Sequence, residues 1–271
     1  MYESYWGLSC RPFDSGLDAF YYPCEAHQGA LLKLRYTIEN RRGAALLAGP
    51  AGVGKTLLVG ALERQLPESF APFVHLVFPQ MPGPQLLIWL AEEMGAGNLG
   101  GSTSIEASVR ALSRAFLQNC ERGRHAVVAI DEAHLLADGN ALETVRLLLN
   151  FEHQGASALT LLLVGQPGLL PALDRMPGLE ERMAVKCLLR PLQLEETISY
   201  VNHRLKAAGA SRTIFENDAL EAVFYLTRGL PRRINRLCDL ALLIGFAEEQ
   251  PTLGATQIEA VSQELVTVSP E

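Results

Sequence analysis

One stretch of this sequence brings together residue types whose chemistry depends on close spacing. It runs from Gly49 to Thr56 in a chain of 271 residues and has the pattern G-x-x-x-x-G-K-T. Its glycines let the backbone curl, so that consecutive N–H groups point into one concavity suited to phosphate oxygens. Lys55 would reach the outer phosphates of a nucleotide, and the Thr56 hydroxyl would ligate Mg²⁺. The stretch therefore predicts a phosphate-binding loop, the P-loop.

The residues on either side of the P-loop agree with this interpretation. Apolar residues 44–48 precede it in the manner of a strand, and the amphipathic run 57–66 follows it in the manner of a helix. The positive N-terminal end of that helix would add to the attraction for phosphate. A glycine-rich turn that matches the motif by chance lacks this context. The residues expected to contact the nucleotide are Gly49, Pro50, Ala51, Gly52, Val53, Gly54, Lys55, Thr56 and Leu57.

Two adjacent carboxylates supply the second element of the predicted chemistry. Asp131 and Glu132 follow the apolar run 126–130, which is typical of a parallel strand covered on both faces. Asp131 would hold Mg²⁺ through its water shell, and Glu132 would orient and polarise an attacking water. A strand that ends in two solvated acids is the plain alternative, but the P-loop upstream favours the catalytic interpretation. His134 either contacts this pair or lies at the surface.

A glutamine follows the next predicted strand, residues 159–164. In a parallel sheet Gln166 would lie beside the P-loop, with its amide within reach of the γ-phosphate or the attacking water. The alternative is a turn residue that precedes Pro167. We expect the sensing role.

Two arginines begin a predicted helix in the C-terminal part of the chain. Pro231 suits the first helical position, which puts Arg232 and Arg233 in the first turn, where the helix dipole disfavours cations. Their presence there indicates an anion opposite them. Nucleotide phosphate is the first candidate and DNA phosphate the second, while two solvated arginines are the plain alternative. We expect Arg232 to contact bound nucleotide.

Strands and helices that alternate as far as Pro191 must position these residues. This alternation predicts an α/β fold with a five-stranded parallel sheet sandwiched by helices, and ligands bind such sheets at the carboxyl ends of the strands. The predicted strands are 44–48, 73–78, 126–130, 159–164 and 185–189. The predicted helices are 26–40, 57–66, 85–94, 105–122 and 141–151.

The remainder of the chain predicts a small all-helical lid domain. Its helices are expected at 194–208, 217–227, 231–248 and 255–265. The domains are therefore 1–191, an N-terminal arm plus the α/β core, and 192–271, the lid. The aromatic arm, residues 1–25, either covers the core or closes over a nucleotide base. The glycine-rich run 95–102 predicts a surface loop.

Composition narrows the class of protein. With 48% hydrophobic and 20% charged residues the chain is typical of a globular protein, and its net charge of −7 argues against DNA as the main partner without excluding it. Five scattered cysteines indicate reduced thiols. The N-terminus lacks the basic and apolar regions of a signal peptide, and the longest apolar stretch, 158–173, contains Gln166 and two prolines. We therefore expect a cytoplasmic protein without a transmembrane segment.

The motifs together resemble the AAA+ ATPase superfamily, in which the P-loop, an acidic pair, a polar residue after the fourth strand and a helical lid occur in this order. Within it the sequence is similar to the ATPase domain of the general secretion pathway protein A family, whose relatives include ATPases that assist some transposases. The motifs that carry this resemblance over about residues 1–265 are Tyr5-Trp6-Gly7-Leu8, Leu163-Val164-Gly165-Gln166-Pro167 and Gly229-Leu230-Pro231-Arg232-Arg233-Ile234-Asn235.

The resemblance implies further roles and partners. It gives Gln166 the sensor-1 place and Arg232 the sensor-2 place, with ATP and Mg²⁺ as cofactors. It also implies an arginine finger that acts on a neighbour's nucleotide, for which Arg182 is the first choice, Arg175 the second and Arg190 a further candidate. A finger supplied in trans implies a homo-oligomer, as a ring or a filament.

Three functions are open at this point. The first is an ATPase that assembles or energises a secretion or cell-envelope system. The resembled family continues into a membrane span and a peptidoglycan-binding module, which do not follow Glu271 here, so this role would need a membrane-anchored partner. The second is an ATP-gated DNA-binding adaptor resembling transposition ATPases. The third is a nucleotide-bound scaffold with little turnover.

Overall fold

The computed structural model describes residues 1–14, 22–100, 104–136 and 141–267. Phe20 and Tyr21 of the aromatic arm, and the end of the glycine-rich run at Gly101 and Ser102, lie outside this part. By its internal packing the chain divides into two compact units. The core unit comprises 26–51 and 55–189, and the helical unit comprises 1–25, 52–54 and 190–271.

The core unit contains a parallel sheet of five strands. Its strand order is β2-β3-β6-β1-β7, and every neighbouring pair runs parallel. The three inner strands are buried along their whole length, because helices cover both faces and no side chain of these strands meets water. The predicted fold class is therefore confirmed. The strands are β1 (Ala44–Ala48), β2 (Phe73–Leu76), β3 (Ala126–Ile130), β6 (Leu159–Gly165) and β7 (Met183–Leu188).

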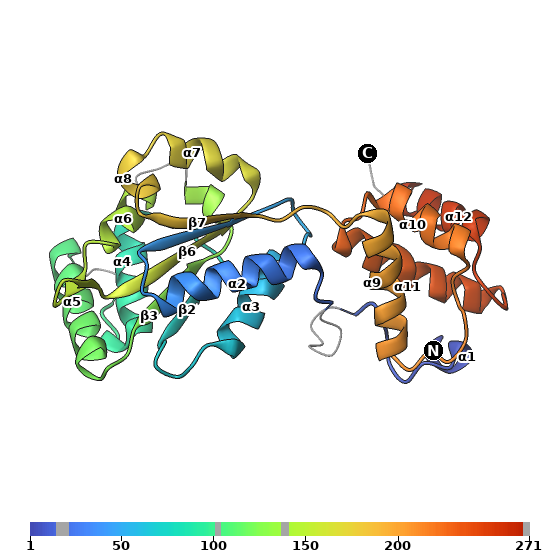
Figure 1. Ribbon diagram of the computed structural model, residues 1–271, viewed down its shortest axis with the longest axis horizontal. Helices are drawn as coiled ribbons and strands as arrows, with labels where there is room; N and C mark the ends of the chain where they lie inside the picture. The colour runs from blue at the N-terminus through green and yellow to red at the C-terminus, as the bar shows by residue number, and fades with distance from the viewer. Residues whose placement is uncertain (15–21, 101–103, 137–140, 268–271) are drawn as a thin grey trace. The chain divides into compact units, whose positions relative to one another are not determined.

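The five predicted helices of the core unit begin within two residues of their predicted positions, and two short helices, α7 and α8, were not predicted. Figure 1 shows α2 and α3 running along the sheet. Residues of α4, α5, α6, α7 and α8 form one buried cluster with alternate residues of the strands. These helices are α2 (Glu25–Glu39), α3 (Lys55–Gln65), α4 (Gly83–Ala91), α5 (Ile105–Glu121), α6 (Ala141–Leu148), α7 (Leu170–Asp174) and α8 (Pro177–Glu180).

Several segments of the core unit differ from the prediction, and one of them is β7, which runs from Met183 to Leu188 rather than over 185–189. Strand β2 ends at Leu76 rather than at residue 78, since Leu76 pairs with Ile130, the last residue of β3. The helix predicted at 85–94 is α4 continued by a π-helical turn, Glu92–Ala96. The helix predicted at 141–151 stops at Leu148, and a short hairpin follows. The hairpin strands are β4 (Glu152–His153) and β5 (Ala156–Ser157).

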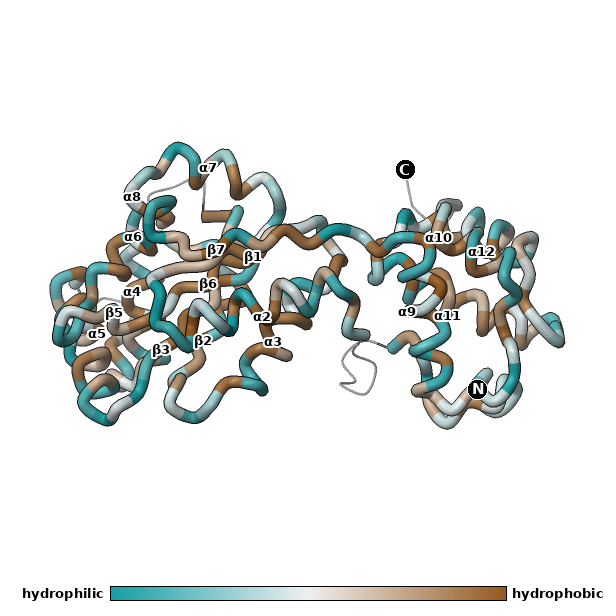
Figure 2. The backbone as a smooth tube through the Cα atoms, in the orientation of Figure 1, coloured by the Kyte–Doolittle hydropathy of each residue, from teal (hydrophilic) through white to brown (hydrophobic). Residues whose placement is uncertain are grey.

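The helical unit contains a short N-terminal helix and four longer helices. In the described part of this unit the only β-pairing is one bridge between Phe215 and Leu253. Figure 2 shows hydrophobic segments alternating with polar ones along its helices, as expected for elements with one buried face. The helices are α1 (Glu3–Trp6), α9 (Leu194–Ala207), α10 (Asn217–Thr227), α11 (Pro231–Ala247) and α12 (Ala255–Thr267).

The N-terminal arm packs into the helical unit, which corrects its assignment to a 1–191 domain with the core. The indole of Trp6 is fully buried and donates a hydrogen bond to Leu242 O, at 2.9 Å. The buried Arg204 guanidinium donates to Pro12 O at 2.6 Å and to Asp14 O at 2.7 Å. Buried polar groups need such partners, and no periodic pattern in the arm marks where they are.

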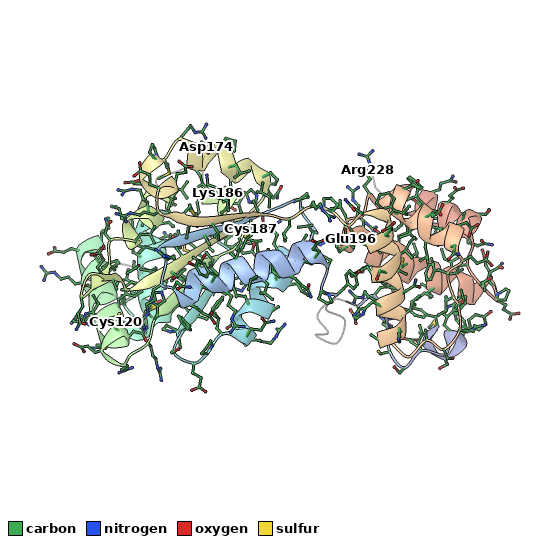
Figure 3. The ribbon with its side chains drawn as sticks, in the orientation of Figure 1. Cys120, Asp174, Lys186, Cys187, Glu196 and Arg228 are labelled. Carbon is green, nitrogen blue, oxygen red and sulfur yellow. The ribbon has the colours of Figure 1, made fainter. Side chains whose placement is uncertain are left out.

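The five cysteines are all free thiols, as the scattered spacing predicts. Burial raises the pKa of Cys120, Cys187 and Cys238, so these thiols are protonated and unreactive near neutral pH. Figure 3 labels Cys120 and Cys187, which belong to α5 and β7.

Among the described residues, no helix is both long and apolar enough to cross a bilayer.

Replacing Gly229 should destabilise the helical unit. Gly229 has a φ of +67°, and its carbonyl accepts the Leu192 N–H at 2.9 Å. A Cβ added there would lie 1.9 Å from Leu192 O. We therefore expect Gly229→Ala to lower the free energy of unfolding by at least about 2 kcal/mol, measured by urea titration. The control is Gly29→Ala in α2, where an added Cβ meets nothing within 4 Å. Equal effects of both substitutions would contradict the prediction.

The buried His125 should make the core unit sensitive to mild acid. Its Nε2 lies 2.9 Å from the Thr160 hydroxyl oxygen. Burial, helped by the charge of Arg41, lowers the pKa of His125 to about 4, whereas an unfolded chain protonates histidine near pH 6.5. The stability that neutral His125 contributes is therefore present above pH 6.5 and lost between pH 6.5 and 4, by up to about 3 kcal/mol.

The free energy of unfolding, measured in urea from pH 7.5 to 5, tests this prediction. We expect it to fall more steeply in the wild type than in His125→Gln, which has no imidazole to protonate. The half-buried His153 in the hairpin provides the control substitution, His153→Gln. Parallel pH curves for the wild type and His125→Gln would contradict the role of His125.

Candidate active site

Strand order brings three segments of the core unit together. Strand β6 lies between β1 and β3, so the residues that follow these three strands meet at the same edge of the sheet. They are the P-loop after β1, Asp131 after β3 and Gln166 after β6. The Gly49 N–H donates to Gly165 O at 3.1 Å, which joins the start of the P-loop to the end of β6.

The P-loop has the backbone that its glycines permit. Gly52 has a φ of +80° and Gly54 a φ of +102°, in the left-handed region that favours glycine. Lys55 begins α3, and its side chain is 5% exposed. Its ammonium donates to Gly49 O at 2.9 Å and to Pro50 O at 3.1 Å. The lysine charge is thus held against the loop backbone, where phosphate would be bound.

Thr56 and Asp131, the two predicted magnesium ligands, lie in contact. The Thr56 hydroxyl donates to Asp131 Oδ2 at 2.5 Å, across 75 positions of sequence. The Asp131 side chain is almost completely buried. Burial raises the pKa of Asp131, but interactions with His75, with the Thr56 hydroxyl and with the Glu132 N–H outweigh it and hold the pKa below its usual value. An ionised carboxylate beside a hydroxyl is a donor set that fits Mg²⁺.

His75 is a neighbour of this site that the sequence interpretation missed. It belongs to β2, the strand beside β3, and its Nε2 lies 3.8 Å from Asp131 Oδ2. That distance is too long for a direct hydrogen bond but short enough for an electrostatic interaction. The sequence did contain a signal for His75. It is a polar residue near the end of a strand, between Val74 and Leu76, and since successive side chains of a strand alternate, it points away from the apolar cluster that contains those two residues.

Glu132 adopts a backbone conformation that is uncommon for its residue type. Its φ is +49°, and its N–H donates to the Asp131 carboxylate at 2.8 Å. A non-glycine residue in this left-handed region costs about 1–3 kcal/mol and persists where the surrounding structure holds it in place. The Glu132 side chain is 43% exposed, and its Oε2 lies 3.3 Å from His134 Nδ1. The acidic pair therefore separates into a buried Asp131 and a solvent-accessible Glu132.

Gln166 lies where the parallel sheet predicts. It is half-buried and directly precedes the short 3₁₀ turn Pro167–Leu169 that follows β6. This puts it between the strand that leads into the P-loop and the strand that ends at Asp131. Its contact with bound nucleotide and its sensing role both stay predictions.

The three candidate finger arginines lie at different places, and only Arg182 is shown to lie at the end of the sheet opposite to the P-loop. Arg182 precedes β7, its carbonyl accepts the Ala44 N–H at 3.1 Å, and its guanidinium donates to Asn150 at 2.8 Å. It therefore lies at the amino end of β1, about five residues or roughly 16 Å from the carboxyl end. Arg175 is exposed at the end of α7. The exposed Arg190 binds the Glu196 carboxylate at 2.6 and 3.0 Å within the helical unit.

Arg232 is an exposed residue in the first turn of α11, as predicted, and belongs to the helical unit.

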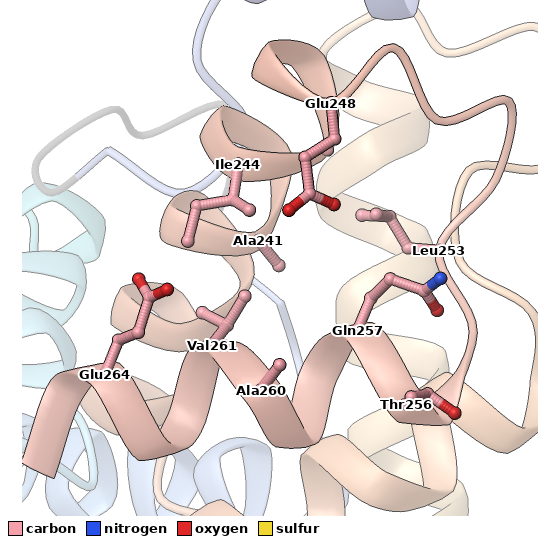
Figure 4. Close-up of a pocket in the computed structure, with 10 residues that line it drawn as sticks. Ala241, Ile244, Glu248, Leu253, Thr256, Gln257, Ala260, Val261 and Glu264 are labelled. Atoms are coloured by element: carbon pink, nitrogen blue, oxygen red, sulfur yellow. The ribbon is translucent and has the colours of Figure 1, made fainter.

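The helical unit holds a cavity of about 230 Å³ between α11 and α12, drawn in Figure 4. Its lining is largely apolar, with the carboxylates of Glu248 and Glu264. Because carboxylates repel phosphate, this cavity is not a second candidate for nucleotide.

Comparison with known proteins agrees with these features. The family model described as "AAA domain" matches residues 38–173. General secretion pathway protein A of Aeromonas hydrophila is 33% identical over 250 residues, which cover 91% of this chain and 45% of that relative. The chain thus spans less than half the length of the curated relative that it matches.

Solved structures share the fold at low sequence identity. Cdc6p of Pyrobaculum aerophilum superposes with a TM-score of 0.72 and 16% identity, covering 96% of this chain and 74% of its own. Drosophila ORC bound to DNA gives a TM-score of 0.70 at 18% identity, and the match covers 94% of this chain and 64% of that chain. The RuvB branch migration motor of Thermotoga maritima gives a TM-score of 0.62 at 18% identity, and the match covers 94% of this chain and 74% of that chain.

The segment matched by the family model includes both the P-loop and the acidic pair at the ends of β1 and β3. The relative extends the similarity through the helical unit. This chain therefore belongs to the AAA+ family of P-loop ATPases and is related to general secretion pathway protein A.

Proposed function

We propose that this protein binds ATP with Mg²⁺ and hydrolyses it by direct attack of water on the γ-phosphate. The observation that carries the proposal is the hydrogen bond between Thr56 and Asp131, with Glu132 as the next residue. It joins the loop that would hold phosphate to the strand end that would hold the metal ion. Membership of a family whose members are generally ATPases supports it.

The chain's own residues have separate roles in this reaction. The P-loop N–H groups and Lys55 bind and orient the β- and γ-phosphates. Thr56 and Asp131 would hold the metal ion, which when bound supplies positive charge that stabilises the phosphate oxygens in the transition state. Glu132 accepts a hydrogen bond from the attacking water and fixes its direction. Gln166 contacts the γ-phosphate or this water and reports whether the phosphate is present.

The nucleotide state would act on assembly and on the helical unit. The distance of Arg182 from the P-loop of its own chain supports action on the nucleotide of a neighbouring copy. Arg232 would contact nucleotide from the helical unit, so that its orientation follows the bound phosphate. The relationship to general secretion pathway protein A supports work in a secretion or cell-envelope system, with a membrane-anchored partner at the cytoplasmic side.

Two substitutions should separate binding from hydrolysis. We expect Lys55→Ala to weaken ATP binding at least about 10-fold, because it removes the positive charge at the outer phosphates. Glu132→Gln should bind ATP with nearly wild-type affinity and lose at least about 100-fold in kcat. Fluorescent nucleotide titration and phosphate release measure the two quantities. The control is Lys186→Ala on β7, which removes an ion pair with Glu180 of α8. Unchanged turnover in Glu132→Gln would instead favour a scaffold.

Complementation between variants should test the finger in trans. We expect Arg182→Ala to lose at least about 100-fold in hydrolysis and Arg175→Ala to lose little. A mixture of Arg182→Ala with Glu132→Gln should regain activity, because one variant supplies an intact finger and the other an intact acidic pair. A mixture no more active than its components would contradict action in trans.

The same assay distinguishes the alternative function, an ATP-gated DNA-binding adaptor. Duplex DNA is added at two salt concentrations, since phosphate contacts weaken steeply with salt. Stimulation of hydrolysis that disappears at high salt would favour the adaptor. The net charge of −7 and the relationship to a secretion protein favour the secretion role instead.

A further inference from the structure

The residue that ends the run Asp131-Glu132-Ala133-His134 has an imidazole nitrogen without a hydrogen bond. His134 is the second residue of the 3₁₀ turn Ala133–Leu136, and its Nδ1 is buried with no hydrogen-bond partner among the residues described. Glu132 Oε2 lies 3.3 Å from this nitrogen. The two atoms are close enough for a hydrogen bond but not aligned for one in this conformation.

The surroundings of His134 limit where its ring can go. A Cβ added to Gly165 would lie 3.3 Å from His134 N and 3.5 Å from its Nδ1. Gly165 and His134 are therefore close neighbours, and a Cβ at residue 165 would be tight against the His134 backbone nitrogen and in van der Waals contact with the ring. The Gly165 carbonyl also accepts the Gly49 N–H of the P-loop. His134 thus lies against the end of β6, the strand whose last residue bonds to the P-loop, and its Nδ1 is 3.3 Å from Glu132 Oε2.

The backbone of Glu132 is fixed, whereas its carboxylate is not. The φ of +49°, the N–H bond to Asp131 and the bond from Leu135 N–H to Glu132 O set the direction of the Cα–Cβ bond. The side chain beyond it is 43% exposed and has three rotatable bonds. A residue that orients water must hold its oxygen within about 0.5 Å, which requires a partner for the carboxylate.

We propose that His134 is a positioning residue that holds the Glu132 carboxylate by donating a hydrogen bond from Nδ1. The inference rests on the proposed function and adds a residue to it. A neutral imidazole with its proton on Nδ1 is sufficient, so no proton is gained or lost by His134 during the reaction. In this arrangement the Glu132 carboxylate keeps its negative charge, and its second oxygen is left to accept a hydrogen bond from the attacking water.

The test compares substitutions that keep, move or remove the donor nitrogen. His134→Asn keeps an N–H near the position of Nδ1, His134→Gln moves it toward the position of Nε2, and His134→Leu removes it. We expect kcat to fall at least about 10-fold in His134→Leu and His134→Gln, with ATP affinity within about 3-fold of wild type. His134→Asn should recover most of kcat.

A double substitution shows whether His134 acts through Glu132. Adding His134→Leu to Glu132→Gln should lower the residual turnover no further, since the group that His134 positions is already gone. Far-ultraviolet circular dichroism and ATP affinity establish that each variant is folded. If His134→Leu does not fold, His134→Gln carries the same comparison.

Three results would overturn the inference. They are equal kcat values in His134→Asn and His134→Leu, a loss of ATP affinity as large as the loss of kcat, and additive losses in the double variant. Wild-type turnover in Glu132→Gln alone would overturn the proposed function and this inference with it. Loss of turnover in Glu132→Gln together with an indifferent His134→Leu would leave the proposed function and reject only the positioning role.

Discussion

The structure depends on a parallel sheet whose inner strands are buried on both faces. In such a sheet the polar residues that bind ligands lie beyond the carboxyl ends of the strands, because the side chains along each strand pack against helices. The order β2-β3-β6-β1-β7 places three such ends next to one another, after β1, β3 and β6. The apolar packing of these strands is therefore the condition for the polar contacts at their carboxyl ends.

The charged groups buried at that edge of the sheet explain why the site contains so many hydrogen bonds. Lys55 and Asp131 are 5% and 3% exposed, and a charge removed from water is costly unless it is paired or hydrogen-bonded. Lys55 is bonded to loop carbonyls, and Asp131 to the Thr56 hydroxyl and the Glu132 N–H. These bonds fix both charged groups in position at the place where the proposed function puts phosphate and a divalent cation.

The helical unit uses the N-terminal arm as part of its own core. Trp6 and Arg204 each find backbone carbonyls as hydrogen-bond acceptors, so a segment at the start of the chain completes a bundle formed by its end. The core unit begins and ends between these two parts. The chain therefore passes from the helical unit into the sheet and back into the helical unit.

Much of this protein could be predicted from local patterns in its sequence. The P-loop motif, the acidic pair after an apolar run and the change to helices after Pro191 depend on spacing between near neighbours, and the fold class and family derived from them are confirmed. The predicted strand bounds at residues 78 and 185 were wrong, because pairing with a neighbouring strand decides where a strand ends: β2 ends at Leu76, and β7 begins at Met183.

Only the tertiary structure decided which distant residues surround the two carboxylates and where the arm packs. His75 approaches Asp131 from a neighbouring strand, His134 fits against Gly165, and Trp6 bonds to a helix more than two hundred residues away. None of these contacts follows a helical or strand period, because each is set by strand order and by the space that packed side chains leave. The sequence therefore determined the chemical groups of the site, and the sheet determined their neighbours.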